Sequence, residues 1–154
     1  MTDAVPLLRP FTLRPGRAFD ARDCARIVND WIDREPWLPR ARSEAEVVRH
    51  YREDVFPSQE VTVAEAAGEV AGFMAFLPAE REVTSLFVDR RGGGIGAALL
   101  NVAKARHHHL TLWAFEANKA ARRFYLREGF RLTDRTAGDN DECMPDVQYR
   151  WDAP

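Results

Sequence analysis

The sequence predicts a single mixed α/β (α+β) domain, and three observations support this fold class. The chain has 154 residues, 45% hydrophobic and 30% charged, a size and balance typical of one globular domain with its own core. Apolar residues recur at helical spacing in some segments and alternate in others. Capping and turn residues separate these segments. The predicted order is β-α-α-β-β-β-α-β-α-β-β, that is, seven strands and four helices.

The first half of the chain combines a strand, two helices and a hairpin. Ser43 and Glu46 have the spacing of a capping box and predict the start of the second helix. Ala67 and Gly68 predict the turn of the hairpin. The predicted elements are a strand at 11–16, helices at 19–33 and from Ser43 onward, and a hairpin at 60–78.

The second half repeats a strand-helix unit twice and ends in two strands. Asn118 is a favourable N-cap, and Gly129 stands at the C′ position where a helix commonly ends. The predicted elements are strands at 81–89, 110–115, 130–136 and 146–151, and helices at about 95–106 and 118–128.

Residues 87–100 (FVDRRGGGIGAALL) place four glycines and two arginines at the start of a predicted helix. The first N–H groups of a helix lack internal partners, and the helix dipole makes this end partly positive. Glycine lets the backbone approach phosphate oxygens, and arginine suits phosphate well. The segment therefore predicts an anion site, with a plain turn as the alternative.

The glycine loop shares features with two nucleotide-binding motifs, the P-loop and the dinucleotide fingerprint. A P-loop requires a lysine after its last glycine, whereas Ala97 follows Gly96. A dinucleotide fingerprint fits better, because Gly92, Gly94 and Ala97 match G-x-G-x-x-A and Glu116 lies about 20 residues further on. The position of the loop argues against it, since about 85 residues precede it and too few follow to complete a doubly wound sheet. A dinucleotide-binding protein remains an alternative.

Two blocks of the chain resemble the GCN5-related N-acetyltransferases (GNAT superfamily). Residues 91–96 (RGGGIG) fit the R-x-x-G-x-G/A signature between a strand and a helix. Residues 110–130 resemble that family's strand-Asn-helix-Tyr-Gly-Phe region, and the first strand and helix are also similar. The resemblance covers nearly the whole chain. One departure is at residues 88–92 (VDRRG), which are two residues shorter than the usual V-x-P-x-x-R-G and lack its proline.

The resemblance implies a central mixed, mostly antiparallel twisted sheet of about seven strands flanked by four helices. It also implies that residues 1–154 form one N-acetyltransferase domain. The first strand and the acceptor-side helices would span about 8–57, the acetyl-CoA-binding core about 60–130, and the C-terminal strands about 130–152.

The resemblance further implies transfer of an acetyl group from acetyl-CoA, as cosubstrate, to a primary amine that attacks the thioester directly. In the family, the strand before the loop pairs its backbone with the pantetheine, and one of its N–H groups polarises the thioester carbonyl. The implied cofactor-binding residues are Leu86, Phe87, Val88, Arg91, Gly92, Gly93, Gly94, Ile95, Gly96, Ala97, Asn118 and Tyr125.

Tyr125 is the general acid that the resemblance implies. A phenol with a pKa of about 10 can give a proton to a departing thiolate, whose thiol has a pKa of about 8.5. Tyr125 follows Asn118 by seven residues, or two helical turns, so both side chains are expected to face the same way. Tyr125 as a core aromatic, and Asn118 as a helix cap alone, are the alternatives.

The general base is expected on one of the two strands that flank the loop. Glu82 is preferred, Glu116 is the alternative, and either carboxylate can act through a water relay. A carboxylate that merely covers the surface is the simpler interpretation of each. A β-bulge in the strand would change the face to which Glu82 points.

The acceptor is expected beside residues 29–43, which flank it in the family. Trp31 and Trp37 are the substrate-binding candidates there and suit an amine with an apolar part, unless both only close the core. The acceptor is a small-molecule or peptide amine, and the chain is expected to be a monomer or homodimer. A non-catalytic acyl-CoA-binding or sensor domain is an alternative from another functional class.

The charge and the motif content of the sequence indicate which other partners are expected. A net charge of −2 and a pI near 6.1 argue against binding to nucleic acid or membrane by charge alone. The sequence has no signal peptide, no spanning apolar run and no cysteine motif, so a cytoplasmic location is expected. No metal is expected, because the consecutive residues His107 to His109 point in different directions and cannot share one ion.

Overall fold

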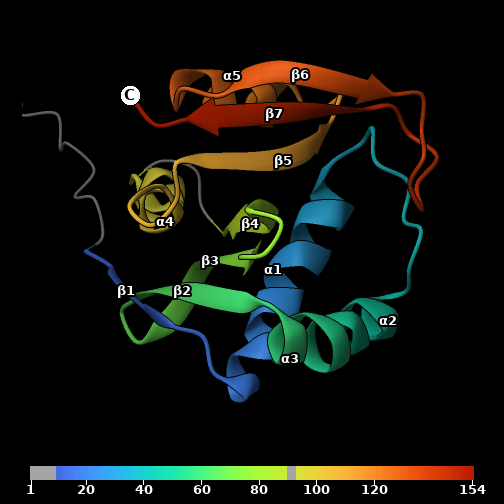
Figure 1. Cartoon of the computed structure of the whole chain (residues 1–154). Helices are drawn as coiled ribbons and strands as arrows, with labels where there is room; N and C mark the ends of the chain where they lie inside the picture. Colours follow the sequence, from blue (N-terminus) through green and yellow to red (C-terminus); the bar gives the residue numbers. More distant parts are fainter. Residues whose placement is uncertain (1–9, 90–92) are drawn as a thin grey trace, which may run out of the picture.

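The computed structural model describes residues 10–89 and 93–154 (Figure 1). The strands are β1 (Thr12–Pro15), β2 (Glu60–Ala66), β3 (Glu69–Leu77), β4 (Glu82–Val88), β5 (His109–Phe115), β6 (Arg131–Thr136) and β7 (Asp146–Asp152). The helical segments are the 3-10 turn η1 (Ala18–Asp20), α1 (Ala21–Arg34), α2 (Glu44–Arg49), the π-helical turn η2 (His50–Val55), α3 (Phe56–Ser58), α4 (Ile95–Lys104) and α5 (Lys119–Arg127).

The seven strands form one sheet in the order β1-β2-β3-β4-β5-β7-β6. Neighbouring strands are antiparallel except for β4 and β5, which are parallel and joined through α4. This mixed, mostly antiparallel sheet with its flanking helices confirms the predicted fold class. The second predicted helix runs through α2, η2 and α3, because one turn in its middle is π-helical.

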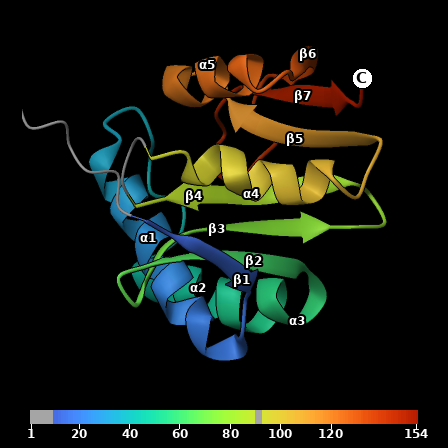
Figure 2. The ribbon, with the colours of Figure 1, turned by 90° about the vertical axis from the view of Figure 1, so that its left-hand side faces the viewer.

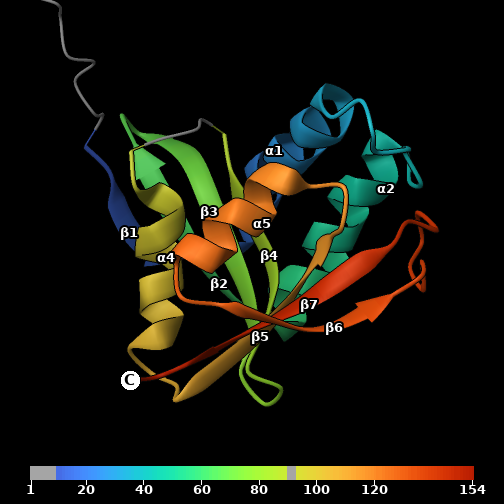
Figure 3. The ribbon, with the colours of Figure 1, turned by 90° about the horizontal axis from the view of Figure 1, so that it is seen from above.

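The helices cover the two faces of the sheet unequally (Figures 2 and 3). The helices α4 and α5 pack on one face and enclose the larger core, which includes Leu99, Leu112 and Tyr149. The helices α1 and α2 with η2 pack on the other face over β2 and β3, where Cys24, Val63 and Phe73 are fully buried. No helix within the described ranges is long and apolar enough to span a bilayer.

Local signals in the sequence place several element ends correctly. Ser43 and Glu46 form the predicted capping box, in which each side chain accepts the other residue's backbone N–H at 3.1 Å. The β2–β3 hairpin turns at Ala67 and Gly68, which both have positive φ (52° and 78°). Two left-handed residues give the turn a twist that matches the strands.

The sheet forks between β4 and β5. These strands pair at only two positions, Glu82 with Thr111 and Val83 with Leu112. Beyond them, β4 continues to Val88 along β3, and β5 continues along β7. The backbone groups that face into the fork therefore have no strand partner among the described residues, and they remain available for another molecule.

A β-bulge at Thr84 sets the direction of the side chains on β4. Ser85 pairs with Ala75 and Val83 pairs with Phe76, so Thr84 is the extra residue. Val83 packs in the core beneath α4, whereas Ser85 and Phe87 face the side of α1 and η2. By the same alternation Glu82 shares the face of Ser85, which it would not share in a regular strand.

Candidate active site

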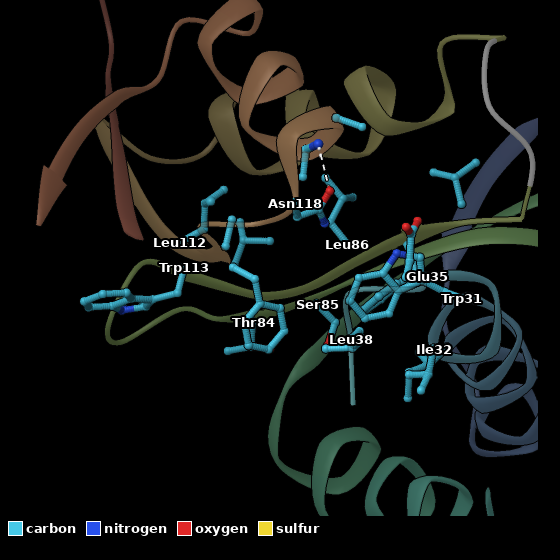
Figure 4. Close-up of a pocket in the computed structure, with 18 of the residues that line it drawn as sticks. Trp31, Ile32, Glu35, Leu38, Thr84, Ser85, Leu86, Leu112, Trp113 and Asn118 are labelled. Carbon is cyan, nitrogen blue, oxygen red and sulfur yellow. Dashed lines mark hydrogen bonds between the residues drawn. The ribbon is translucent and has the colours of Figure 1, made fainter. Parts of the chain in front are cut away.

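A cavity of about 840 Å³ opens at the fork of the sheet (Figure 4). Its walls come from α1 and the loop after it, from α2 and η2, from β4 and β5, from the start of α4, from the length of α5 and from the β6–β7 loop. Ten residues named in the sequence analysis line it: Trp31, Leu86, Phe87, Val88, Gly94, Ile95, Gly96, Ala97, Asn118 and Tyr125. The structure therefore brings the predicted cosubstrate residues and one predicted acceptor residue to a single site.

Some predicted site residues lie elsewhere. Trp37, Glu82 and Gly93 are described but do not line this cavity. Arg91 and Gly92 lie outside the described residues. The glycine loop is thus represented in the cavity wall by its helical end, from Gly94 to Ala97.

The start of α4 is arranged to receive an anion. Gly94 is the N-cap and has a φ of 77°, and its carbonyl accepts the N–H of Ala98 at 3.0 Å. The N–H groups of Ile95, Gly96 and Ala97 come before that bond and donate to no described residue. Because these residues line the cavity at the positive end of a ten-residue helix, they fit a phosphate group of coenzyme A.

The glycines at this end serve two different purposes. A Cβ on Gly93 or Gly94 would meet nothing within 4 Å, so their positive φ rather than space requires glycine. A Cβ on Gly96 would stand 3.0 Å from the Phe124 ring. Gly96 therefore lets α4 and α5 approach closely, and it shapes the cavity between them.

Asn118 and Tyr125 reach the same cavity from α5, as their two-turn spacing predicts. The Asn118 Oδ1 accepts the N–H of Ala121 at 3.1 Å, so Asn118 is the helix cap, and it also lies in the cavity wall. Tyr125 packs against Phe130 and Tyr149 in the core, and its hydroxyl bonds to no described residue. Burial raises the pKa of this phenol, which therefore keeps its proton at neutral pH.

Glu82 lies beside the main cavity. It lines a second cavity of about 390 Å³ that shares Val83, Thr84, Trp113 and Asp146 with the first. Glu82 is half-buried, and its pKa is raised by burial and then by the charge of Glu80. A carboxylate in this place can accept a proton from the main cavity through water.

Glu116 lies outside both cavities. Its carboxylate pairs with Arg135 at 2.9 Å, and its backbone N–H donates to the carbonyl of Pro145. The carboxylate is thus engaged by a guanidinium and faces neither cavity. The geometry therefore favours Glu82 of the two candidates.

Aromatic rings bridge the open end of the fork. Trp31 lies edge to face with Phe87 of β4 at 5.1 Å between ring centroids, and with Trp37 at 6.0 Å. Trp37 in turn contacts Phe115 of β5 at 5.8 Å. Trp31 thus forms part of the cavity wall, while Trp37, which does not line the cavity, links Trp31 to Phe115 of β5.

Two arginines hold the loop after α1, which carries Trp37. Arg40 donates to the Asn29 side chain at 2.9 Å and to Asp33 at 2.8 Å, which ties the loop back to α1. Arg42 pairs with Asp141 at 2.8 Å, which joins this loop to the β6–β7 loop across the cavity rim.

Several cavity residues have no clear signal in the sequence. Arg123 and Arg127 of α5 line the cavity and add positive charge. Tyr51 and Ser85 are buried in its wall, and their hydroxyl oxygens lie 3.0 Å apart. The apolar spacing of 43–51 identifies Tyr51 only as a buried helix residue, and nothing local distinguishes Ser85. In the described part of the chain, no group of three or more His, Cys, Asp or Glu side chains is placed to hold a metal ion.

Comparison with known proteins agrees with this geometry. The family model described as acetyltransferase (GNAT) domain matches residues 57–132. The peptidyl-lysine N-acetyltransferase YiaC of Escherichia coli K12 is 26% identical over 130 residues, covering 81% of this chain and 88% of YiaC.

Solved structures share the fold. The apo form of YjaB from Escherichia coli superimposes with a TM-score of 0.77 at 23% identity, covering 94% of this chain and 99% of YjaB. A ribosomal-protein-alanine N-acetyltransferase from Brucella melitensis gives 0.68 at 20% identity, covering 92% and 99%. The matched family model covers the fork and the glycine-capped α4 and identifies residues 57–132 as a domain of the GNAT superfamily of acetyltransferases, and the shared fold agrees with it.

Proposed function

We propose that the protein is an acetyl-CoA-dependent N-acetyltransferase that moves the acetyl group to a primary amine by direct attack on the thioester. The observation that carries this proposal is the single cavity at the fork. It joins the anion-binding start of α4, the free backbone edge of β4 and the Tyr125 hydroxyl. Each part matches one part of acetyl-CoA, namely its phosphates, its pantetheine arm and its thioester sulfur.

The cosubstrate would be held mainly by backbone groups. The N–H groups of Ile95, Gly96 and Ala97 receive a pyrophosphate oxygen, and the edge of Leu86 to Val88 pairs with the pantetheine amides. An N–H of this edge polarises the thioester carbonyl and stabilises the oxyanion that forms during attack. The Asn118 amide is placed to bond to the same arm.

Two side chains would handle the protons. The ammonium group of the acceptor loses a proton through water to Glu82, and the free nitrogen then attacks the carbonyl carbon. As the C–S bond breaks, Tyr125 gives its proton to the departing thiolate. The raised pKa values of both residues support these roles, because one keeps a proton to give and the other binds a proton readily.

The acceptor would lie on the α1 side of the fork. Trp31, Phe87 and Leu38 form an apolar wall there, and Asp141 and Glu142 stand at the rim. An amine with an apolar stem suits this wall, and the carboxylate of Glu142 favours a cation, whereas Asp141 is paired with Arg42. Since YiaC acts on peptidyl lysine, a lysine side chain of a peptide is one such acceptor to test, beside small-molecule amines.

The test is a panel of amines and lysine peptides incubated with acetyl-CoA, with thiol release as the readout. Turnover with at least one amine is the expected result. Calorimetric binding of acetyl-CoA without turnover on the panel would favour a sensor domain, and absence of binding would overturn both proposals. Cytoplasmic location, monomer or homodimer state, and lack of nucleic acid or membrane partners stay predictions.

A further inference from the structure

The Tyr51–Ser85 hydrogen bond is a buried polar contact in the cavity wall. Tyr51 is 5% exposed and Ser85 is 7% exposed, and both line the cavity. Their surroundings include the rings of Phe73 and Phe87. Buried polar groups are nearly always hydrogen-bonded, so each O–H of this pair is expected to have an acceptor.

The count of donors leaves one O–H without a partner. Two hydroxyls carry two protons, and their single mutual bond of 3.0 Å uses one of them. Neither oxygen bonds to any other described residue. Whichever hydroxyl donates to the other, the remaining O–H needs an acceptor, and the cavity is where one can stand.

The protein fixes this pair firmly. Tyr51 projects from the π-helical turn η2, and its ring lies edge to face with Phe73 at 5.4 Å. Phe73 stacks on Phe87 at 5.8 Å. The bulge at Thr84 turns Ser85 toward Tyr51, one residue before the Leu86–Val88 edge. The pair is therefore held on the acceptor side of that edge, and π-helical turns of this kind often occur at functional sites.

The same bulge connects the pair to Glu82. Ser85 and Glu82 share one face of β4, and Thr84 between them lines both cavities. Other titratable groups near the pair are His50 on η2, which bonds to Asp54, and Cys24 and Arg42, which bond to neither hydroxyl. The carboxylates of the main cavity wall include Glu35, which accepts from Trp37, Asp141, which pairs with Arg42, Asp146, which accepts from Thr136, and Glu142. Glu82 differs from these in sharing the strand face of Ser85, so the path is assigned to it.

We propose that Tyr51 and Ser85 hold the water molecule that takes the proton from the acceptor's ammonium group. This rests on the proposed function. One lone pair of that water accepts the spare O–H, and the other accepts the ammonium N–H. The N–H bond breaks as a new O–H bond forms on the water, and the water passes a proton to the Glu82 carboxylate. Tyr51 and Ser85 are positioning residues in this path.

The test compares Ser85→Ala and Tyr51→Phe with two acceptors, a strongly basic amine that is protonated at the assay pH and a weakly basic amine that is not. Each variant is expected to lower kcat roughly three- to tenfold with the protonated amine, the effect of losing one hydrogen bond to an uncharged partner. The kcat with the uncharged amine and the KM for acetyl-CoA should stay within twofold.

The controls separate positioning from structure. Ser58→Ala removes an exposed hydroxyl that bonds to the Asp54 carbonyl, and it should change neither rate. The double variant should be no slower than the slower single variant, because the pair acts as a unit. Equal losses with both amines, or no loss with either, would overturn the inference. Absence of turnover by the unmodified protein would instead overturn the proposed function.

Discussion

Tyr125 shows how one residue serves both core and site. Its ring packs in the core against Phe130 and Tyr149, and the residue also lines the cavity. The two interpretations that the sequence left open are therefore compatible. Burial stabilises the protonated phenol, which is the form that a general acid needs before the thiolate leaves.

Removing this hydroxyl should separate rate from binding. We expect Tyr125→Phe to lower kcat about 100-fold, the usual range for loss of a general acid, while the Kd for acetyl-CoA changes less than threefold. Steady-state kinetics and calorimetry measure the two effects. Tyr149→Phe is the matched control, because Tyr149 is a buried phenol that does not line the cavity. Equal losses in both variants would assign Tyr125 a packing role only.

Glu82 should determine the acidic side of the pH profile. The base must be ionised, so kcat/KM falls as pH drops through its pKa, which burial and Glu80 raise above the ordinary glutamate value of about 4.3. Glu82→Gln should lower kcat/KM about 100-fold and remove this limb. Glu80→Gln should keep the rate and move the limb to lower pH, because it removes the repulsion. A limb that persists in Glu82→Gln would contradict the assignment.

At the scale of single elements, the sequence predicted where helices begin and end better than it predicted irregularities inside helices and strands. The Ser43 capping box, the Asn118 cap and the Gly129 stop are local hydrogen-bonding or backbone preferences, so they can be read from a few residues. The π-helical turn at η2 and the bulge at Thr84 depend on packing against other elements. These two departures place Tyr51 and Ser85, which is why the sequence alone did not bring them into the site.

The β2–β3 turn contains a correctable strain. Ala67 has a φ of 52°, a left-handed conformation that costs an alanine about 1 kcal/mol or more. We expect Ala67→Gly to raise the free energy of unfolding by about 0.5–1 kcal/mol, and Tm by roughly 2–4 °C. Ala79→Gly, at an exposed turn position without positive φ, should give no gain. Thermal denaturation measures the Tm of both variants. An equal rise in Tm in the two variants would contradict the assignment of strain to Ala67.

At the scale of the whole molecule, the cavity should discriminate among nucleotide ligands. At 100 times its Kd a ligand stabilises the folded state by about 2.7 kcal/mol. We expect acetyl-CoA and CoA to raise Tm by roughly 5–10 °C, and NAD(P) and FAD to leave it unchanged. Stabilisation by a dinucleotide and not by CoA would favour the dinucleotide alternative that the match at Gly92, Gly94 and Ala97 left open.

The overall topology was predictable because strong apolar patterns and two motif blocks extend over most of the chain. The order of strands in the sheet was not predicted, because pairing between distant segments is not written in local sequence, and the resemblance implied only a mixed, mostly antiparallel sheet. The positions of Trp37 and Glu82 outside the main cavity show the same limit. The resemblance implied that both lie near the site, but ring packing and the bulge decided which surface each one meets.

The fork also determines how the protein should respond to its cosubstrate over time. Two halves of one sheet, β1–β4 and β5–β7–β6, are paired at only two positions, so the seam between them has few backbone bonds to resist local opening. A pantetheine arm bonded along β4 would act as the missing neighbour strand. Those amide hydrogens of Leu86 to Val88 that point into the fork, away from β3, would then exchange with solvent more slowly in the complex, while those at the β2–β3 turn would not. The cosubstrate would thus serve as a removable part of the fold as well as a reactant.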